Sequence, residues 1–462
     1  MTSLRCWALG MSMRQKRRTA AVLAAIAATG LGNAAAAAAT AAAQPVAWGT
    51  TRSAPAGTLG ELFGVAAASS ADVLAVGGFN PGQPPTALPT LPYAEHWTGS
   101  AWRVTSVPLG QVYPQGQTAQ LNGVSEIAAG NGWAVGTVSD PSSFASQTLA
   151  YHWDGTAWTR SPTPDPAGAQ LTNELNAVAA RAASDVWAVG GDGNNPEASL
   201  VLHWNGSTWK QVSVPDIGRL DAVAVAPGDI WVAGADHVEQ FNGTTWTKLP
   251  VPPVPPTDFP FITGLAHTSA GLWAVGRLEF GCGEGSTCTS SYAALWNGTT
   301  WTEAPAGSGN GLGGVVAAGS KVLAVSGPDV LRLSLAGATS QVTPAPGERT
   351  VVAIAADPAG NLWAVGSTIV GQQTQPAIIN APGIGQGGII VTTGASGATV
   401  TWVGPVKGAG SADLSGHFAV GGLPAGGYSV VASLPGCQPG TATAKVTAGV
   451  ATAVTADISC PP

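Results

Sequence analysis

The chain has 462 residues, which is enough for two or three domains with a sizeable core. Charged residues make up only 9% of the chain, where about 25% is usual, and 25 acidic residues outnumber 18 basic ones. This balance argues against nucleic acid or an anionic membrane surface as a partner, because both attract basic proteins.

Residues 1–43 have the features of a secretory signal: a basic stretch at 14–18, an apolar run and several Ala-x-Ala cleavage options. Cleavage is expected between Ala36 and Ala43, which leaves 13 basic against 25 acidic residues, a net charge of −12. The adjacent Arg17 and Arg18 leave the general and the twin-arginine export routes both open. No later segment has 18 or more consecutive apolar residues. The sequence therefore predicts a secreted or cell-envelope protein without a membrane contact after cleavage.

A motif of the form Asp-Val-Trp-Ala-Val-Gly-Gly recurs seven times, at intervals of 40 to 59 residues. A short run rich in Ala and Val precedes each copy, and further alternating segments follow, so each repeat is expected to form four short strands. Seven units at this period predict an all-β fold, a seven-bladed β-propeller over residues 45–380. The copies are Asp72–Gly78, Gly132–Gly136, Asp185–Gly191, Asp229–Gly234, Gly271–Gly276, Lys321–Gly327 and Asn361–Ser367.

Five of the repeats continue with a Trp-x-Gly-x-x-Trp unit, in which one copy has Phe in place of the first Trp. In the copy at 204–209, the Asn-Gly pair predicts a hairpin with a two-residue type I′ turn. That turn would place Trp204 opposite Ser207, and Leu202 opposite Trp209. Both tryptophans would then lie on one face of the hairpin, because side chains alternate along a strand.

The shared face of the two tryptophans is expected to pack against the neighbouring blade, although aromatic pairs could also stack on sugars. His96, His152 and His203 occupy the same position in three successive repeats and point to the other face. They could form a ring of ligands, but they belong to different blades and lie far from the axis. A structural role is the favoured interpretation for both the tryptophans and the histidines.

The seventh repeat lacks its fourth strand, and the missing strand is found near the N-terminus. Val46–Pro55 matches Thr156–Pro164, with Trp48 in the place of Trp158. We therefore expect the N-terminal segment to supply the outer strand of the last blade. Such a strand would close the ring and remove the exposed sheet edges.

These repeats resemble secreted bacterial seven-bladed propellers of the kelch or galactose-oxidase-like type, and the resemblance covers residues 45–380. It implies the fold but no activity, because propellers carry unrelated functions.

After a linker at 381–387, residues 388–462 are expected to form a small β-sandwich. The run ADLSGHFAVGGLPAGGYSVVA resembles carboxypeptidase regulatory-like domains, which have a transthyretin-like fold. Such a domain is interpreted as a spacer or stabiliser, with a carbohydrate-binding module as the alternative. The residues on the pattern are Asp413, Gly416, Phe418, Leu423, Pro424, Gly427 and Tyr428.

Four cysteines follow the predicted signal, and an even number in an exported chain indicates disulfides. Their spacing favours the pairs Cys282–Cys288 and Cys437–Cys460. Free buried thiols are the alternative, and a metal site is disfavoured because no histidine cluster accompanies the cysteines.

Catalytic motifs are absent from the sequence: there is no G-x-S-x-G, H-E-x-x-H, C-x-x-C or phosphate-binding loop. The arginines and tyrosines are too scattered to predict a sialidase-type or copper site. No cofactor and no metal are expected, and a binding protein is favoured over an enzyme.

Long, variable loops are predicted on one side of the propeller, opposite the short Asn-Gly turns, and binding usually resides in such loops. We expect a monomer that binds an extracellular polysaccharide or protein through this face. The alternatives are a secreted glycan-active lyase or hydrolase and a structural envelope component. The candidate ligand-binding residues are Phe79, Tyr113, Asp192, Asp258, Phe259, Glu279 and Phe280.

Overall fold

The computed structural model describes residues 49–51, 59–80, 90–109, 118–140, 143, 145–193, 198–215, 217–235, 237–250, 254–255, 257–283, 286–307, 309–318, 321–340, 349–370, 373–381, 387–405, 407–412, 416–423, 426–447 and 451–461. The predicted signal at 1–43, Trp48, Tyr113, Asp413 and Pro424 lie outside these ranges. Within the described ranges, no helix is long and apolar enough to cross a membrane.

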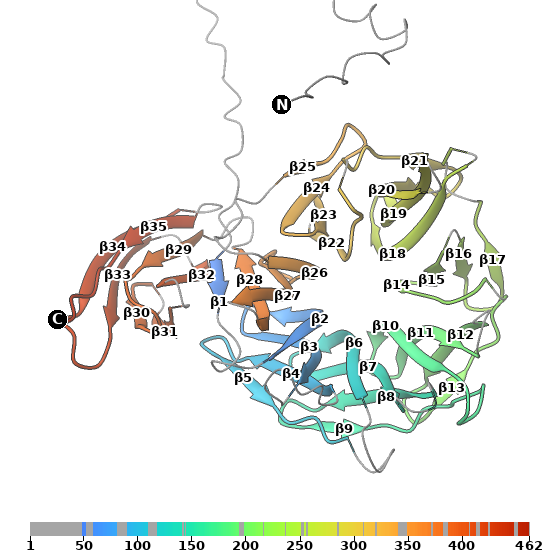
Figure 1. Cartoon of the computed structure of the whole chain (residues 1–462), viewed down its shortest axis with the longest axis horizontal. Helices are drawn as coiled ribbons and strands as arrows, with labels where there is room; N and C mark the ends of the chain where they lie inside the picture. Colours follow the sequence, from blue (N-terminus) through green and yellow to red (C-terminus); the bar gives the residue numbers. More distant parts are fainter. Residues whose placement is uncertain are drawn as a thin grey trace, which may run out of the picture. The chain divides into compact units, whose positions relative to one another are not determined.

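Residues 49–381 form four-stranded antiparallel sheets in which successive strands pair with one another. Figure 1 shows the sheets arranged around a common centre, with the first strand of each innermost, as in a β-propeller. The first three sheets are β2 (Leu59–Ser69), β3 (Asp72–Asn80), β4 (Leu91–Trp97) and β5 (Trp102–Thr105); β6 (Thr118–Ala128), β7 (Asn131–Ser139), β8 (Ser146–Trp153) and β9 (Trp158–Arg160); and β10 (Asn173–Ala182), β11 (Asp185–Asp192), β12 (Ala198–Trp204) and β13 (Trp209–Gln211).

The next three sheets are β14 (Ala222–Ala226), β15 (Asp229–Gly234), β16 (His237–Phe241) and β17 (Trp246–Lys248); β18 (Phe259–Thr268), β19 (Gly271–Gly283), β20 (Ser286–Trp296) and β21 (Trp301–Glu303); and β22 (Val315–Ala318), β23 (Lys321–Ser326), β24 (Asp329–Leu333) and β25 (Thr339–Ser340). The repeated motif forms the second strand of each sheet. In β11 every residue between the two ends is buried, because neighbouring sheets cover both faces.

The sheet of β26 (Arg349–Ala356), β27 (Leu362–Val370) and β28 (Gln373–Ala381) takes its outer strand from the N-terminal region. Strand β1 (Gly49–Thr51) pairs antiparallel with β28, so that Gly49 lies opposite Asn380 and Thr51 opposite Ile378. This confirms the prediction that the segment around Val46–Pro55 completes the last sheet. The same sheet contacts β2 of the first one.

The inner strands approach one another so closely that glycine or alanine is required at the contact. A Cβ atom on Gly64 would lie 3.2 Å from Cα of Gly123, and one on Gly123 would lie 3.2 Å from Cα of Ala177. Larger side chains would force these strands apart. The small residues leave a narrow central channel of about 330 Å³, lined by residues 63–65, 122–124, 176–178, 221–223, 263–265, 313–315 and 352–354.

The hairpin register predicted for the Trp-x-Gly-x-x-Trp unit is wrong. Trp204 lies directly opposite Trp209, and Leu202 lies opposite Gln211 rather than opposite Trp209. The loop therefore has four residues instead of two. The two tryptophans still share one face, as predicted, because cross-strand partners point to the same side.

The four-residue loop is closed by the side chain of Asn205 rather than by a type I′ turn. Its Oδ1 atom accepts hydrogen bonds from the backbone N–H groups of Ser207 and Thr208, each at 3.0 Å. Gly206 has a φ of +94°, but among the described non-glycine residues only Ala235 has a positive φ. Asn205 is thus outside the left-handed region, and it acts as an Asx-turn residue.

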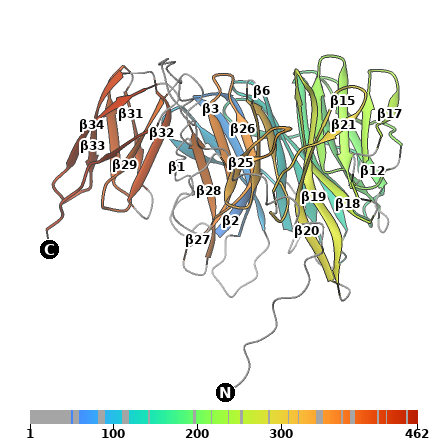
Figure 2. The same ribbon diagram turned by 90° about the horizontal axis from the view of Figure 1, so that it is seen from above.

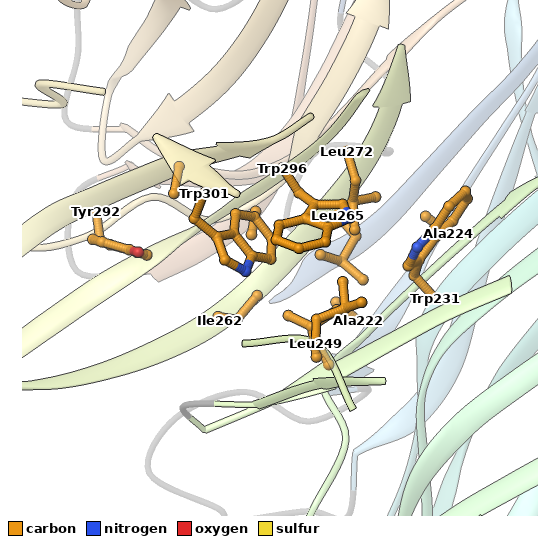
Figure 3. Packing of buried hydrophobic residues seen from close by; sticks show 14 of the residues in the cluster. Ala222, Ala224, Trp231, Leu249, Ile262, Leu265, Leu272, Tyr292, Trp296 and Trp301 are labelled. Carbon is orange, nitrogen blue, oxygen red and sulfur yellow. The ribbon is translucent and has the colours of Figure 1, made fainter. Parts of the chain in front are cut away.

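The tryptophan pairs fill the space between adjacent sheets, as predicted. Trp133 of β7 lies 4.7 Å from Trp204 and 5.1 Å from Trp209 of the next sheet, measured between ring centroids. Figure 3 shows the corresponding cluster between the sheets of β14–β17 and β18–β21, where Trp296 and Trp301 lie near Ala222 and Leu249. Packing of this kind explains why tryptophan recurs in the sequence.

The repeated histidines have structural contacts. His203 Nε2 lies 3.0 Å from Asp185 Oδ1, and its ring stacks on Trp187 at 4.4 Å. His96 makes the same contact with Asp72, at 2.7 Å, and the third histidine bonds to an asparagine at the equivalent position. These contacts join the second and third strands of three successive sheets, in agreement with the structural role that the sequence favours.

Residues 387–461 form two further sheets. One contains β32 (His417–Leu423), β29 (Gly387–Thr392) and β35 (Ala451–Thr455), and the other contains β31 (Lys407–Ser411), β30 (Thr399–Val403), β33 (Gly426–Ser433) and β34 (Gly440–Val446). Strand β29 pairs antiparallel with β32 and parallel with β35. Trp402 and Phe418, from different sheets, stack at 5.4 Å in a shared core, which gives a small β-sandwich.

Both predicted disulfides are present. Cys282–Cys288 joins β19 and β20 near the tip of their hairpin, with 5.7 Å between the Cα atoms. Cys437–Cys460 ties the segment after β33 to the end of the described chain, with 4.3 Å between the Cα atoms.

Candidate polar site at the mouth of the central channel

A polar cavity of about 640 Å³ lies where the inner strands begin. Eleven of its twelve lining residues are polar or charged, and Phe63 is the exception. Five of these residues, including Phe63 and Asn122, also line the narrow channel, so the cavity continues into it. The first strands begin and the second strands end at this side of the sheets, which is the side predicted to carry the long loops.

Strands β6 and β7 supply one wall of the cavity. Thr118 pairs with Ser139 and Gln120 pairs with Thr137, so these four side chains lie on one face. Gln120 Nε2 donates a hydrogen bond to Oδ1 of Asn122, at 2.8 Å. The wall therefore offers hydroxyl and amide groups held in a fixed arrangement.

Arg219 is the centre of a second group of cavity residues. Its guanidinium lies 3.1 Å from Glu174 and 3.1 Å from Asp221, and it donates to Oδ1 of Asn176 at 3.3 Å. Asn176 in turn donates to the backbone oxygen of Leu220, at 2.9 Å, in the segment that leads into β14. Positive and negative groups are thus paired across two sheets.

Arg277 of β19 forms the third group. Its Nε atom donates to Oε1 of Glu279 at 3.0 Å, and its guanidinium lies 4.5 Å from the ring centroid of Phe261. Thr263, on the inner strand of the same sheet, donates its hydroxyl proton to the backbone oxygen of Leu312 at 2.7 Å. Arg277 is therefore held in place by both a charge and an aromatic ring.

Of the candidate residues predicted from the sequence, none of the six that the structure describes lines this cavity. Phe79 packs against Tyr93 at 5.6 Å, and Asp192 lies at the end of β11 opposite Asn173. Phe280 lies opposite Cys288 in the disulfide-linked hairpin.

Two of the predicted residues lie beside the cavity wall. Glu279 bonds to Arg277, and Phe259 lies opposite Glu279 in the same sheet, while Asp258 directly precedes Phe259. Tyr113 is outside the described residues.

The cavity residues are not evident from the sequence, because the arginines are scattered along the chain. Arg219 precedes β14 and Arg277 lies 58 residues further along the chain in β19, yet both line one cavity. One sequence pattern does point to the cavity. Asn122, Asn176 and Asp221 each precede Gly-Val or Ala-Val at the same place in their repeats. A polar residue repeated at that place indicates a lined channel mouth.

Within the described ranges, no three His, Cys, Asp or Glu residues are grouped so that they could hold a metal ion. The cavity residues are hydrogen-bond donors and acceptors whose charges are paired. This arrangement can bind a ligand that carries many hydrogen-bonding groups.

The chain matches no family model, and it matches no curated protein. Solved structures do resemble it. YCF48 bound to a D1 peptide is 12% identical, with a TM-score of 0.44, and the match covers 72% of this chain and 96% of that one. An alpha-L-arabinanase of Penicillium chrysogenum complexed with arabinobiose is 13% identical, with a TM-score of 0.44, and the match covers 72% of this chain and 97% of that one. The WD40 repeats of RRP9 are 11% identical, with a TM-score of 0.48, and the match covers 73% of this chain and 99% of that one.

At TM-scores below 0.5 these resemblances carry no argument about this chain, and the β-propeller arrangement rests on its own sheets. The matched proteins include peptide-binding and sugar-binding examples alike, at identities too low to transfer a function.

Proposed function

We propose that this protein is an exported, non-enzymatic binding protein that takes a carbohydrate in the cavity at the channel mouth. The cavity is the observation that carries the proposal. Its volume of about 640 Å³ is within the range of about 300–1,000 Å³ usual for small-molecule sites, but its lining is unusually polar. A sugar offers hydroxyl groups that can donate and accept at every such position.

The paired charges favour an uncharged ligand. Arg219 is bonded to Glu174 and Asp221, and Arg277 is bonded to Glu279, so neither arginine is an isolated positive charge. A carboxylate or phosphate ligand would have to compete with these carboxylates. A neutral polysaccharide fits better than an anionic ligand, and a protein segment is the other candidate that the sequence left open.

A seven-bladed ring, closed by β1, is part of this proposal. The support is the pairing of β1 with β28 and the contact of their sheet with β2. We further propose that the C-terminal sandwich is of the carboxypeptidase regulatory-like type and acts as a spacer or stabiliser. Two disulfides support an exported protein, because such bonds persist in oxidising compartments.

A glycan-active enzyme is the second candidate, since two carboxylates, Glu174 and Asp221, lie in the cavity. A glycosidase needs one carboxyl group that can donate a proton to the leaving oxygen. Both carboxylates are instead bonded to one guanidinium, that of Arg219. This arrangement suits positioning rather than proton transfer, and it favours binding without turnover.

The test is a glycan array followed by calorimetry with the purified protein. Gln120→Ala and Arg277→Gln should each weaken glycan binding by about tenfold, the effect of losing one or two hydrogen bonds. Lys210→Ala, an exposed change on the outer strand β13, is the matched control and should bind like the wild type. Release of reducing ends from the bound glycan would favour the enzyme instead. An array without any glycan bound would overturn the proposal.

A further inference from the structure

The sheet of β18–β21 is taller than its neighbour at the cavity side. Trp273 and Val275 of β19 pack against Val322 and Ala324 of β23. Strand β23 ends at Ser326, where a tight turn leads into β24. Gly276 occupies the same place in its repeat as Ser326, but β19 continues for seven residues beyond it, to Gly283. Figure 2 shows the hairpin of β19 and β20 extending beyond the rest of the sheets at the lower edge. One face of this hairpin therefore continues past the end of β23.

The face that continues past β23 carries two rows of paired side chains, and Gly311 covers part of the inner row at Arg277. Phe261 lies opposite Arg277 in the row that lines the cavity, and Phe259 lies opposite Glu279 in the next row outward. Thr289 of β20 completes the outer row. The rows are two residues apart along the strands, about 7 Å, so they form a continuous strip that leads out of the cavity.

Phe259 is the exposed aromatic residue of this strip. Its exposure is 64%, the highest among the exposed large hydrophobic residues of the described chain, and the others in that set are aliphatic. Single exposed hydrophobic residues are common and need no ligand to explain them. Phe259 differs because its ring stands in line with Phe261 and the Arg277–Glu279 ion pair at the edge of a polar cavity.

We propose that Phe259 forms an outer stacking subsite for a neutral saccharide chain whose end occupies the cavity. This inference rests on the proposed function and adds that the ligand is an oligomer. A sugar ring has an apolar C–H face that can lie on an aromatic ring, and hydroxyl groups at its edge that can bond to Glu279 and Thr289. The spacing of the two rows is of the order of one sugar ring with its linkage.

A saccharide is favoured over a peptide for this strip. An extended peptide gains affinity by pairing with a free strand edge. Strand β19 carries Arg277 and Glu279 in the middle of the strip and is hydrogen-bonded to β18 on one side and to β20 on the other. A peptide could therefore pair only with the outer edge of β18 or of β20, and not with the face that carries Phe259. The strip offers a flat sheet face with alternating aromatic and charged groups, which suits stacking and edge-on hydrogen bonds.

The experiment is calorimetric titration with di- to hexasaccharides derived from cellulose, xylan, mannan and chitin. In the series that binds best, Phe259→Ala should weaken the hexasaccharide roughly three- to tenfold and leave the disaccharide unchanged. Phe259→Trp should restore the affinity, and its indole fluorescence should change with the hexasaccharide alone. Leu335→Ala, which changes an exposed aliphatic residue in the turn between β24 and β25, is the control.

The outcomes separate the two proposals. If Gln120→Ala weakens the disaccharide but Phe259→Ala changes no member of the series, the outer subsite is wrong and the cavity proposal stands. If the wild type binds none of the saccharides, the proposed function fails and the subsite fails with it. If Phe259→Ala weakens capture of peptides from a random library but of no saccharide, the strip is a peptide site and this inference is overturned.

Discussion

The two ends of each sheet differ in what their side chains do. At the end with the Asn-Gly loops, the connections are short and tryptophans are buried between sheets, with Trp133 only 3% exposed. At the cavity end, polar residues bond to one another and stay accessible, with the Arg219 side chain 45% exposed. Strand β19 contains both kinds of residue, because Trp273 is buried and Arg277 and Glu279 reach solvent. The comparison teaches that stability and recognition can be separated along the same strands.

The largest effect is expected from Trp133→Ala at the Asn-Gly end. It would leave a cavity beside Trp204 and Trp209, and the free energy of unfolding should fall by about 3–5 kcal/mol. Chemical denaturation measures this change, and the free energy of unfolding should fall clearly less for Trp133→Phe than for Trp133→Ala. A loss below about 1 kcal/mol for the alanine variant would break the comparison, because this end would then not carry the stability.

Glu126, near the Asn-Gly end, should make stability depend on pH. Burial, and then the nearby charge of Asp72, raise the pKa of its carboxyl group from 4.5 to about 9, although the backbone N–H of Ala68 donates to it at 3.1 Å. Between these two pKa values the folded protein holds a proton that the unfolded chain has released. The stabilising contribution of Glu126 is therefore fully present below about pH 4.5, and it is lost as the pH rises toward 9.

The slope attributable to Glu126 should be roughly 1 kcal/mol per pH unit. Denaturation midpoints of the wild type and of Glu126→Gln, measured from pH 5 to pH 8, test this prediction. The variant should have the flatter profile. Parallel profiles for the two proteins would show that Glu126 does not hold the extra proton.

A smaller effect is expected from the loop asparagine. Asn205→Ala removes the Oδ1 atom that accepts hydrogen bonds from two backbone N–H groups. The free energy of unfolding should therefore fall by about 1 kcal/mol. Asn205→Asp is the matched control, since Asp154 makes the same bonds to Thr156 and Ala157 in another repeat. An aspartate variant as unstable as the alanine variant would contradict the Asx-turn explanation.

The smallest effect on stability is expected at the cavity end. Phe259→Ala should change the free energy of unfolding by no more than about 0.5 kcal/mol, because the ring is mostly exposed. Thermal denaturation beside the wild type measures it. A loss above about 2 kcal/mol would show that Phe259 supports the fold, and the separation of stability from recognition would not hold for this sheet.

Much of the fold could be predicted because the signals are local and repeated. The position of each second strand, the N-terminal strand beside β28 and both disulfides follow from repeat period, motif matching and cysteine spacing. The hairpin register was predicted wrongly because one local rule competed with another. The Asn-Gly pair is compatible with a type I′ turn, but the side chain of Asn205 bonds to the backbone two and three residues on.

The candidate site was decided by the tertiary structure. Glu174 and Arg277 belong to different sheets and Arg219 precedes the first strand of a third, and no local pattern indicates that they meet. Phe259 was singled out in the sequence as a loop residue, but the length difference between β19 and β23 is what leaves it exposed beside the cavity. The sequence by itself determined the strands and their order, since these depend on periodicity along the chain. The cavity depends on packing the strands around a common axis, which brings distant residues within hydrogen-bond distance.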